Sequence, residues 1–204
     1  VADIACFRGS HINHLTPRTL DIDAVQAAML AQGMVVKQVI EGPPRRNVPI
    51  LLRQTSFAAR SEPIHFPDDT TGIRSHHKAR FGEVEQRGIA LTPKGRALYD
   101  RLLAVTLAGQ SIEQSFSAFP DSLDRLRDDG LAYFTYNLGP NGEMTVEPIL
   151  YEDFLPVSAA GIFRSNMAGA DHEAFAAVPA QTMFEQALGV PVIDMFALYA
   201  DQQA

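Results

Sequence analysis

The chain has 204 residues, 46% of them hydrophobic and 20% charged, which is the composition of a folded globular protein. Its 17 basic and 24 acidic residues give a formal net charge of −7, which argues against a nucleic-acid partner because phosphate binding requires a basic surface. No run of about 18 apolar residues occurs, so we expect no membrane span and no membrane partner. A single cysteine, Cys6, excludes an internal disulfide and a multi-cysteine zinc site, and it fits a cytoplasmic location.

Turn and capping signals in the first 90 residues predict a β-α-β-β-β order. The first strand covers residues 11–18, and Asp23 is the expected N-cap of a helix over 24–32 that Gly33 ends. Further elements are strands over 34–40, 50–57 and 80–89, with loops over 42–47 and 60–77. The predicted fold class is therefore α+β with an open mixed sheet.

The rest of the chain is predicted to add helices and a hairpin. Thr92 and Pro93 are the expected N-cap and first residue of a helix, because proline costs nothing at that position. A second, short helix is expected between Pro120 and Gly130. Two strands, over 131–137 and 144–151, form a hairpin across the Asn-Gly turn, and residues 171–188 are mostly helical.

Strand alternation places polar side chains on shared faces of three predicted strands: His14 and Arg18 on the first, Gln54 and Ser56 on the third, Glu83 and Glu85 on the fourth. A plain core would carry valine or leucine there. Histidine and glutamate are suitable ligands for Fe(II), Mn(II) or Zn(II). The spacing alone leaves two interpretations open, a metal site and the solvated face of an antiparallel sheet.

Motifs on the first and fourth predicted strands resemble a known metal-binding module. Ile12-Asn13-His14-Leu15, the helix after it, and the segment 81–87 resemble the β-α-β-β-β module of the vicinal oxygen chelate superfamily. The resemblance implies a metal held by a histidine on the first strand and a glutamate on the fourth. Residues 83–87, Glu-Val-Glu-Gln-Arg, are similar to the Glu-x-x-Gln-Arg of 4-hydroxyphenylpyruvate dioxygenase, and that match selects Glu83 as the ligand over Glu85.

Longer segments resemble one family more closely, the 2-oxoadipate dioxygenase/decarboxylases; these segments are 11–18, 50–57, 79–88, 91–96 and 157–163. The resemblance implies an Fe(II) enzyme of lysine catabolism that uses O2 to convert 2-oxoadipate to 2-hydroxyglutarate with loss of CO2. It also implies a vicinal oxygen chelate type metal-binding module over residues 1–90. A helical and hairpin extension over 91–204 is expected to pack on that module.

The resemblance assigns roles residue by residue. His14 and Glu83 correspond to metal ligands, and the expected substrate contacts are Arg18, Gln54, Ser56 and the backbone of Val190. The family's other histidine and a substrate arginine lie in an N-terminal His-x-x-x-Arg segment that this chain lacks. With a start at Val1, we therefore expect the C-terminal half of such an enzyme, inactive on its own. An N-terminal module or an oligomer partner would then supply the third ligand.

Other interpretations stay open at this point. A different vicinal oxygen chelate metalloenzyme, a lyase or isomerase with Zn(II) or Ni(II), would use the same fold, and a non-catalytic module would only bind a small acid. Arg18 would then pair with Asp21 or Asp23. Glu85 is expected either to support the metal ligands from a neighbouring position or to pair with an arginine. The Arg45-Arg46 pair is expected to be solvated loop charge.

Overall fold

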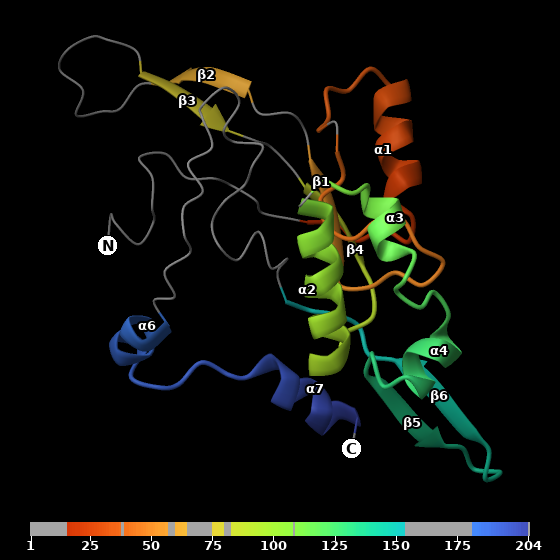
Figure 1. Ribbon diagram of the computed structural model, residues 1–204. Helices are drawn as coiled ribbons and strands as arrows, with labels where there is room; N and C mark the ends of the chain where they lie inside the picture. Colours follow the sequence, from red (N-terminus) through yellow and green to blue (C-terminus); the bar gives the residue numbers. More distant parts are fainter. Residues whose placement is uncertain are drawn as a thin grey trace. The chain divides into compact units, whose positions relative to one another are not determined.

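The computed structural model describes residues 16–37, 39–56, 60–64, 75–79, 83–107, 109–153 and 181–203, and at 60–64, 75–79 and 107 it describes the backbone alone (Figure 1). The helices are α1 (Ile22–Ala31), α2 (Pro93–Leu107), α3 (Ile112–Phe116), α4 (Leu123–Asp128), α6 (Gln181–Leu188) and α7 (Met195–Gln203). The strands are β1 (Leu52–Ser56), β2 (Arg60–Ile64), β3 (Ser75–Ala79), β4 (Glu83–Arg87), β5 (Phe134–Leu138) and β6 (Met144–Pro148). No helix among these residues is both long and apolar enough to cross a membrane.

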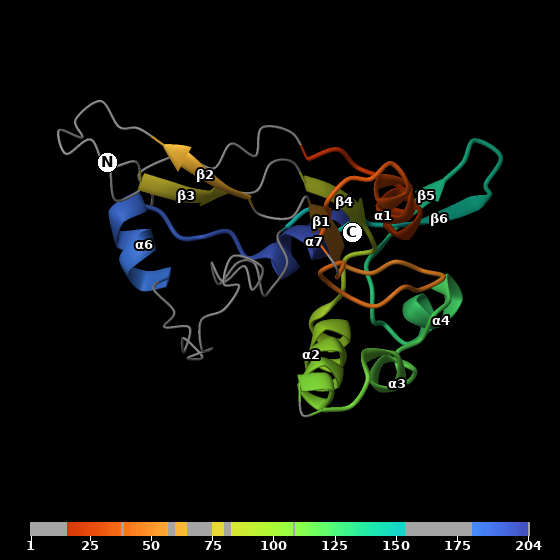
Figure 2. The same ribbon diagram turned by 90° about the horizontal axis from the view of Figure 1, so that it is seen from above.

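Within the described ranges the strands form three two-stranded sheets, β1–β4, β2–β3 and β5–β6, so the α+β fold class is confirmed (Figure 2). β5 and β6 are the predicted hairpin, antiparallel, with Gly142 in its turn at φ +79°. The predicted loop over 60–77 is wrong, because β2 and β3 pair antiparallel from Arg60↔Ala79 to Ile64↔Ser75. Their sequences lack apolar alternation, and β2 contains a proline, which a strand with one unpaired edge tolerates.

The chain divides into two compact units that are discontinuous in sequence. Among described residues, the first unit contains 16–37, 39–41, 53–56, 60–64, 75–79 and 83–86. The second contains 42–52, 87–153 and 181–203, apart from residue 108. The chain passes between the units within β1 and within β4. The division at residue 90 stays a prediction.

Helix α1 begins two residues earlier than the capping pattern predicts. Asp21 is its N-cap, and its Oδ1 accepts a hydrogen bond from the Ala24 N–H at 3.0 Å. Asp23 therefore lies in the first turn, where its side chain is available to a neighbouring strand. The predicted end at Gly33 is confirmed, because this glycine adopts φ +74° just after the C-cap.

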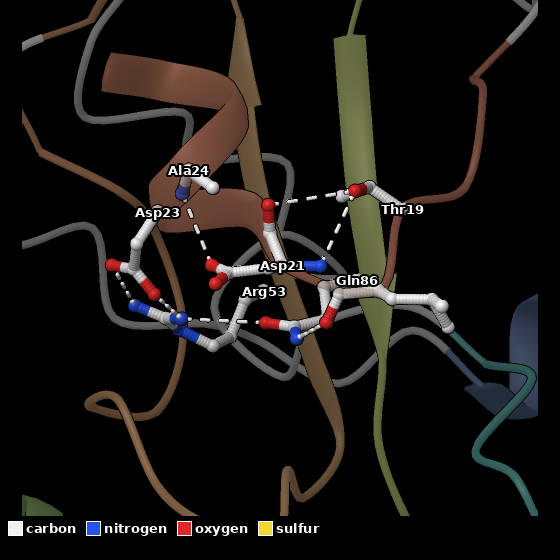
Figure 3. A network of polar contacts seen from close by, with 7 residues as sticks. Thr19, Asp21, Asp23, Ala24, Arg53 and Gln86 are labelled. Carbon is white, nitrogen blue, oxygen red and sulfur yellow. Dashed lines mark hydrogen bonds and ion pairs between the residues drawn. The ribbon is translucent and has the colours of Figure 1, made fainter. Parts of the chain in front are cut away.

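Arg53 on β1 links α1 to the sheet (Figure 3). Its Nη1 and Nη2 donate to the two carboxylate oxygens of Asp23 at 2.6 and 3.1 Å, and Nη1 also donates to Gln86 Oε1 at 3.3 Å. The Gln86 amide in turn donates to the Leu20 carbonyl. Gln26 on α1 donates to Thr55 Oγ1 at 3.3 Å. The helix therefore covers the face of β1 that carries Arg53 and Thr55.

The predicted strand over 34–40 is not formed by its described residues; isolated bridge contacts take its place. The Lys37 N–H donates to the Ser56 carbonyl at 2.8 Å, and Glu41 pairs antiparallel with Gln54. This segment still borders β1, so the predicted neighbour relation holds although the regular ladder does not.

The second unit has the larger apolar core. Its buried side chains include Ile50, Leu51, Leu52, Leu91, Tyr99, Phe116, Leu126, Tyr133, Phe134, Tyr151 and Tyr199. α2 begins as predicted, with Thr92 Oγ1 accepting from the Gly95 N–H at 3.1 Å. The Tyr199 hydroxyl accepts from the Glu152 N–H at 2.8 Å, so α7 is tied to the segment after β6.

The interpretation of Arg46 as solvated loop charge is wrong, because its side chain is buried. Its guanidinium donates to the carbonyls of Phe119 and Pro120 at 2.8 and 2.7 Å, and lies 5.1 Å from the Phe119 ring centroid. Burial lowers the pKa of Arg46, and the charge of Asp121 opposes this shift. The carbonyls in the connection between α3 and α4 have no helical N–H group to accept from. Arg46 supplies the missing donors, which explains why this loop arginine turns inward. The preceding arginine remains exposed.

Replacing Arg53 by methionine should lower the free energy of unfolding by about 2–4 kcal/mol, because Asp23 and Gln86 lose a largely buried partner. Urea denaturation followed by circular dichroism measures the loss. Arg125→Met is the matched control, since Arg125 forms an exposed pair with Asp129, and it should cost less than about 0.5 kcal/mol. Equal losses for the two variants would contradict the role given to Arg53.

Burial raises the pKa of both Tyr99 and Tyr151 to about 12. The unfolded chain loses these protons near pH 10, before the folded chain does, so the free energy of unfolding should fall as pH rises from about 10 to about 12. Each tyrosine contributes a slope of up to about 1.4 kcal/mol per pH unit. Denaturation at several pH values should show a shallower slope for Tyr99→Phe, and an unchanged slope would refute this assignment.

Candidate functional site

The face of β1 opposite α1 is polar and buried. Since Arg53 and Thr55 point toward the helix, strand alternation places Gln54 and Ser56 on the other face. Gln86 of β4 contacts Arg53, so Glu85 also belongs to the opposite face. Gln54, Ser56 and Glu85 are all buried, which excludes a solvated sheet face for these three side chains.

Glu85 ties this face to the segment that precedes α1. Its backbone N–H donates to the Pro17 carbonyl at 3.1 Å, and its carbonyl accepts from the Thr19 N–H at 2.8 Å. Arg18 and Glu85 form a parallel bridge, and Arg18 Nε donates to Glu85 Oε1 at 3.2 Å. The predicted pairing of Glu85 with an arginine is confirmed. The Arg18 side chain is 54% exposed and that of Glu85 only 7%, so the pair holds a solvent-accessible guanidinium on a buried carboxylate.

Gln54 is the least satisfied polar side chain of this face. It is 7% exposed, and its backbone pairs with Glu41 in both directions, at 2.8 and 2.9 Å. Its side-chain amide makes no hydrogen bond to any part of the chain that the structure describes. An amide that makes no hydrogen bond within the described chain is suited to a bound water or ligand.

Lys37 and Glu41 are two charged residues beside β1 that the sequence pattern does not single out. Lys37 Nζ lies 2.5 Å from Glu41 Oε1, and the lysine side chain is almost completely buried. Glu41 stands directly opposite Gln54. The sequence feature that could have identified them is a lysine and a glutamate four residues apart, next to a strand with buried polar residues. In an isolated sequence that spacing also fits an ordinary surface pair.

The other expected site residues are distributed as follows. Glu83, at the start of β4, is half-buried, and strand alternation puts it on the face of Glu85. His14 lies outside the described residues. Val190 belongs to the second unit, where it follows α6 and is exposed. The described ranges contain no group of three or more His, Cys, Asp or Glu side chains that could hold a metal.

The chain matches one family model, described as 2-oxoadipate dioxygenase/decarboxylase, over residues 1–166. The proteins of that name from Escherichia coli K12 and Pseudomonas putida are 49% and 46% identical to it, over 230 and 237 aligned residues. Both alignments cover 100% of this chain and 51% of the relative. The chain thus spans about half the length of the curated relatives it matches.

Solved structures agree with the sequence matches. The hydroxyglutarate synthase from Pseudomonas putida in complex with 2-oxoadipate superimposes with a TM-score of 0.76 at 46% identity, covering 97% of this chain and 49% of that one. An uncharacterized protein from Shigella flexneri gives a TM-score of 0.75 at 46% identity, covering 97% and 47%. From the family model and these relatives together, the chain belongs to the 2-oxoadipate dioxygenase/decarboxylase family.

Proposed function

We propose that this chain carries one part of the active site of a non-haem Fe(II) dioxygenase/decarboxylase that converts 2-oxoadipate and O2 to 2-hydroxyglutarate and CO2. The names of the relatives and the 2-oxoadipate complex of the Pseudomonas putida protein support this substrate and reaction. The observation that carries the proposal in this chain is the buried polar face of β1 and β4. This face carries Gln54, Ser56 and Glu85, and the Gln54 amide makes no hydrogen bond within the described chain, so the face is suited to a polar occupant.

The order of neighbouring segments supports a vicinal oxygen chelate type module in the first unit. Residues 17–19 pair with β4, β4 pairs with β1, and β1 borders the segment that ends at Glu41. In sequence, α1 lies between residues 17–19 and the segment that ends at Glu41, and β1 and β4 follow. This order matches β-α-β-β-β with the β2–β3 pair inserted between β1 and β4. We propose that this module extends back to the first strand predicted from the sequence.

The parallel bridge of Arg18 with Glu85 supports the assignment of the metal ligands. In the strand predicted over 11–18, alternation would put His14 on the same face as Arg18, and in β4 it puts Glu83 on the same face as Glu85. The ion pair of Arg18 with Glu85 brings those two faces together. The half-buried Glu83 carboxylate and the His14 imidazole are donor types that fit Fe(II). Bound there, Fe(II) would supply the Lewis acidity and the redox chemistry that O2 requires.

The chain's own residues would hold the 2-oxo acid. Arg18, oriented by Glu85, offers a guanidinium to a substrate carboxylate, an interaction that arginine makes with two parallel hydrogen bonds. Gln54 and Ser56 would hydrogen-bond to the substrate from the floor of the face. The backbone of Val190 remains an expected contact. By burying the polar atoms around the substrate, this face would strengthen each of these interactions relative to water.

The remaining ligand would come from the half of the family polypeptide that this chain does not span, or from an oligomer partner. We therefore propose that the chain is inactive on its own. Lysine degradation and a cytoplasmic location stay predictions.

His14→Ala and Glu83→Ala should each weaken Mn(II) or anaerobic Fe(II) binding by about tenfold or more, because each removes a ligand. Titration calorimetry of the purified chain measures the affinity. Glu143→Gln removes an exposed carboxylate from the β5–β6 turn and should leave the affinity unchanged. Metal binding that survives both ligand substitutions would eliminate the proposed site.

Gln54→Leu should weaken binding of 2-oxoadipate by about fivefold to tenfold, the value of one hydrogen bond. Its thermal stability should not fall, because the amide makes no hydrogen bond within the described chain. Thr55→Val is the control on the opposite face: it removes the acceptor of Gln26 and should lower stability without weakening substrate binding. If Gln54→Leu destabilises the fold and leaves substrate affinity intact, Gln54 is structural and its assignment is wrong.

A further inference from the structure

Helix α6 (Gln181–Leu188) and the turn after it expose several large apolar side chains within eleven residues. We call this set the 183–193 strip: Met183, Phe184, Leu188, Val190, Val192 and Ile193. Their exposed fractions run from 43% to 77%, and α6 has no buried residue. On the helix, positions 183, 184 and 188 lie on one side, as in an amphipathic helix, yet none of them belongs to the apolar core formed by the described residues.

The strip is nevertheless locally ordered. Glu185 Oε1 accepts from the Gln181 amide at 2.9 Å and from the Val192 N–H at 3.0 Å. The Gly189 N–H donates to the Glu185 carbonyl at 2.8 Å, and Gly189 adopts φ +78°. Two hydrogen bonds lower the pKa of Glu185, and the one from Gln181 has a larger effect than the one from Val192. These contacts hold the turn against the helix, so the apolar residues on both present a single preformed surface.

A preformed apolar surface of this kind is unfavourable in water. Single exposed hydrophobic residues are ordinary, but contiguous apolar patches on a soluble protein mark places where other polypeptide packs. An eight-residue helix is also too short to be stable by itself, and its stability normally comes from packing its apolar side. The strip therefore requires a covering partner.

The length of the family polypeptide identifies that partner. This chain covers 51% of the curated relatives and 47–49% of the matched crystal structures, so each relative contains about as much additional polypeptide. The structural match covers 97% of this chain. We propose that the 183–193 strip is the surface on which the half of the family polypeptide absent from this chain packs. This inference does not rest on the proposed metal site or substrate, although Val190 of the strip is also an expected substrate contact.

The test compares this chain alone with the same chain joined to the remaining half of the Pseudomonas putida relative, at the junction found in that relative. The strip variant carries Phe184→Ser and Ile193→Ser. The control variant carries Thr182→Ala and Gln186→Ala, which alter exposed polar residues of the same helix. Thermal denaturation and hydrogen exchange of residues 181–193 are measured for every form.

We expect exchange of residues 181–193 to slow by about tenfold or more in the joined protein. The strip variant should lower the Tm of the joined protein by about 4 °C or more, and the control should not. In the chain alone neither variant should change the Tm. The strip variant is also made at the aligned positions of the full Pseudomonas putida protein, which should lose stability in the same way.

Three outcomes would overturn the inference. A comparable loss of Tm in the chain alone would show that the strip belongs to its own core. A concentration-dependent dimer of the chain alone, abolished by the strip variant, would identify a second copy as the occupant. The strip variant and the control variant could also give equal exchange of residues 181–193 and equal Tm, both in the joined protein and in the full relative. That result would show that nothing packs on the strip.

Discussion

The first unit depends on the burial of a strand that is mostly polar. Strand β1 is buried along its whole length, yet four of its five residues, Arg53 to Ser56, carry polar side chains. Each such group must find a partner, because an unpaired polar atom in a dry environment costs more than a hydrogen bond contributes. On one face the partners come from α1 and β4, through Asp23 and Gln86. The polar groups of that face therefore have their partners within the chain.

The other face of β1 is built differently, and it is the face that we propose binds the ligand. Gln54 has no side-chain partner in the described chain, while Glu85 binds an arginine that reaches toward solvent. A face that is buried and polar but incompletely satisfied by its own chain is suited to a small polar ligand. Arg18, Gln54 and Ser56 supply complementary groups for an acid with several oxygens. The 2-oxoadipate complex of the Pseudomonas putida relative is the reason for proposing that acid as the substrate.

The second unit has the opposite character. It is organised by an apolar core of buried aromatic and aliphatic residues, and α7 is anchored to it through Tyr133 and Tyr199. Helix α6 lies outside this core and exposes its apolar side. A polypeptide that covers about half of its relatives is expected to present surfaces of this kind, because a core shared between two halves leaves each half with uncovered apolar residues. The proposed third metal ligand from outside the chain is consistent with the same division.

Local sequence signals determined the elements that have strong capping or turn residues. These are α2 after Thr92-Pro93, the β5–β6 hairpin around its glycines, and the end of α1 at Gly33. Strand periodicity also separated the two faces of β1 and β4, because alternation is a property of the backbone alone. Only the tertiary structure decided which partner each charge takes. Asp23 pairs with Arg53 instead of capping α1, Arg46 turns inward to free carbonyls, and β2 pairs with β3 without any apolar pattern. These outcomes depend on contacts between residues far apart in the chain, which local propensity does not encode.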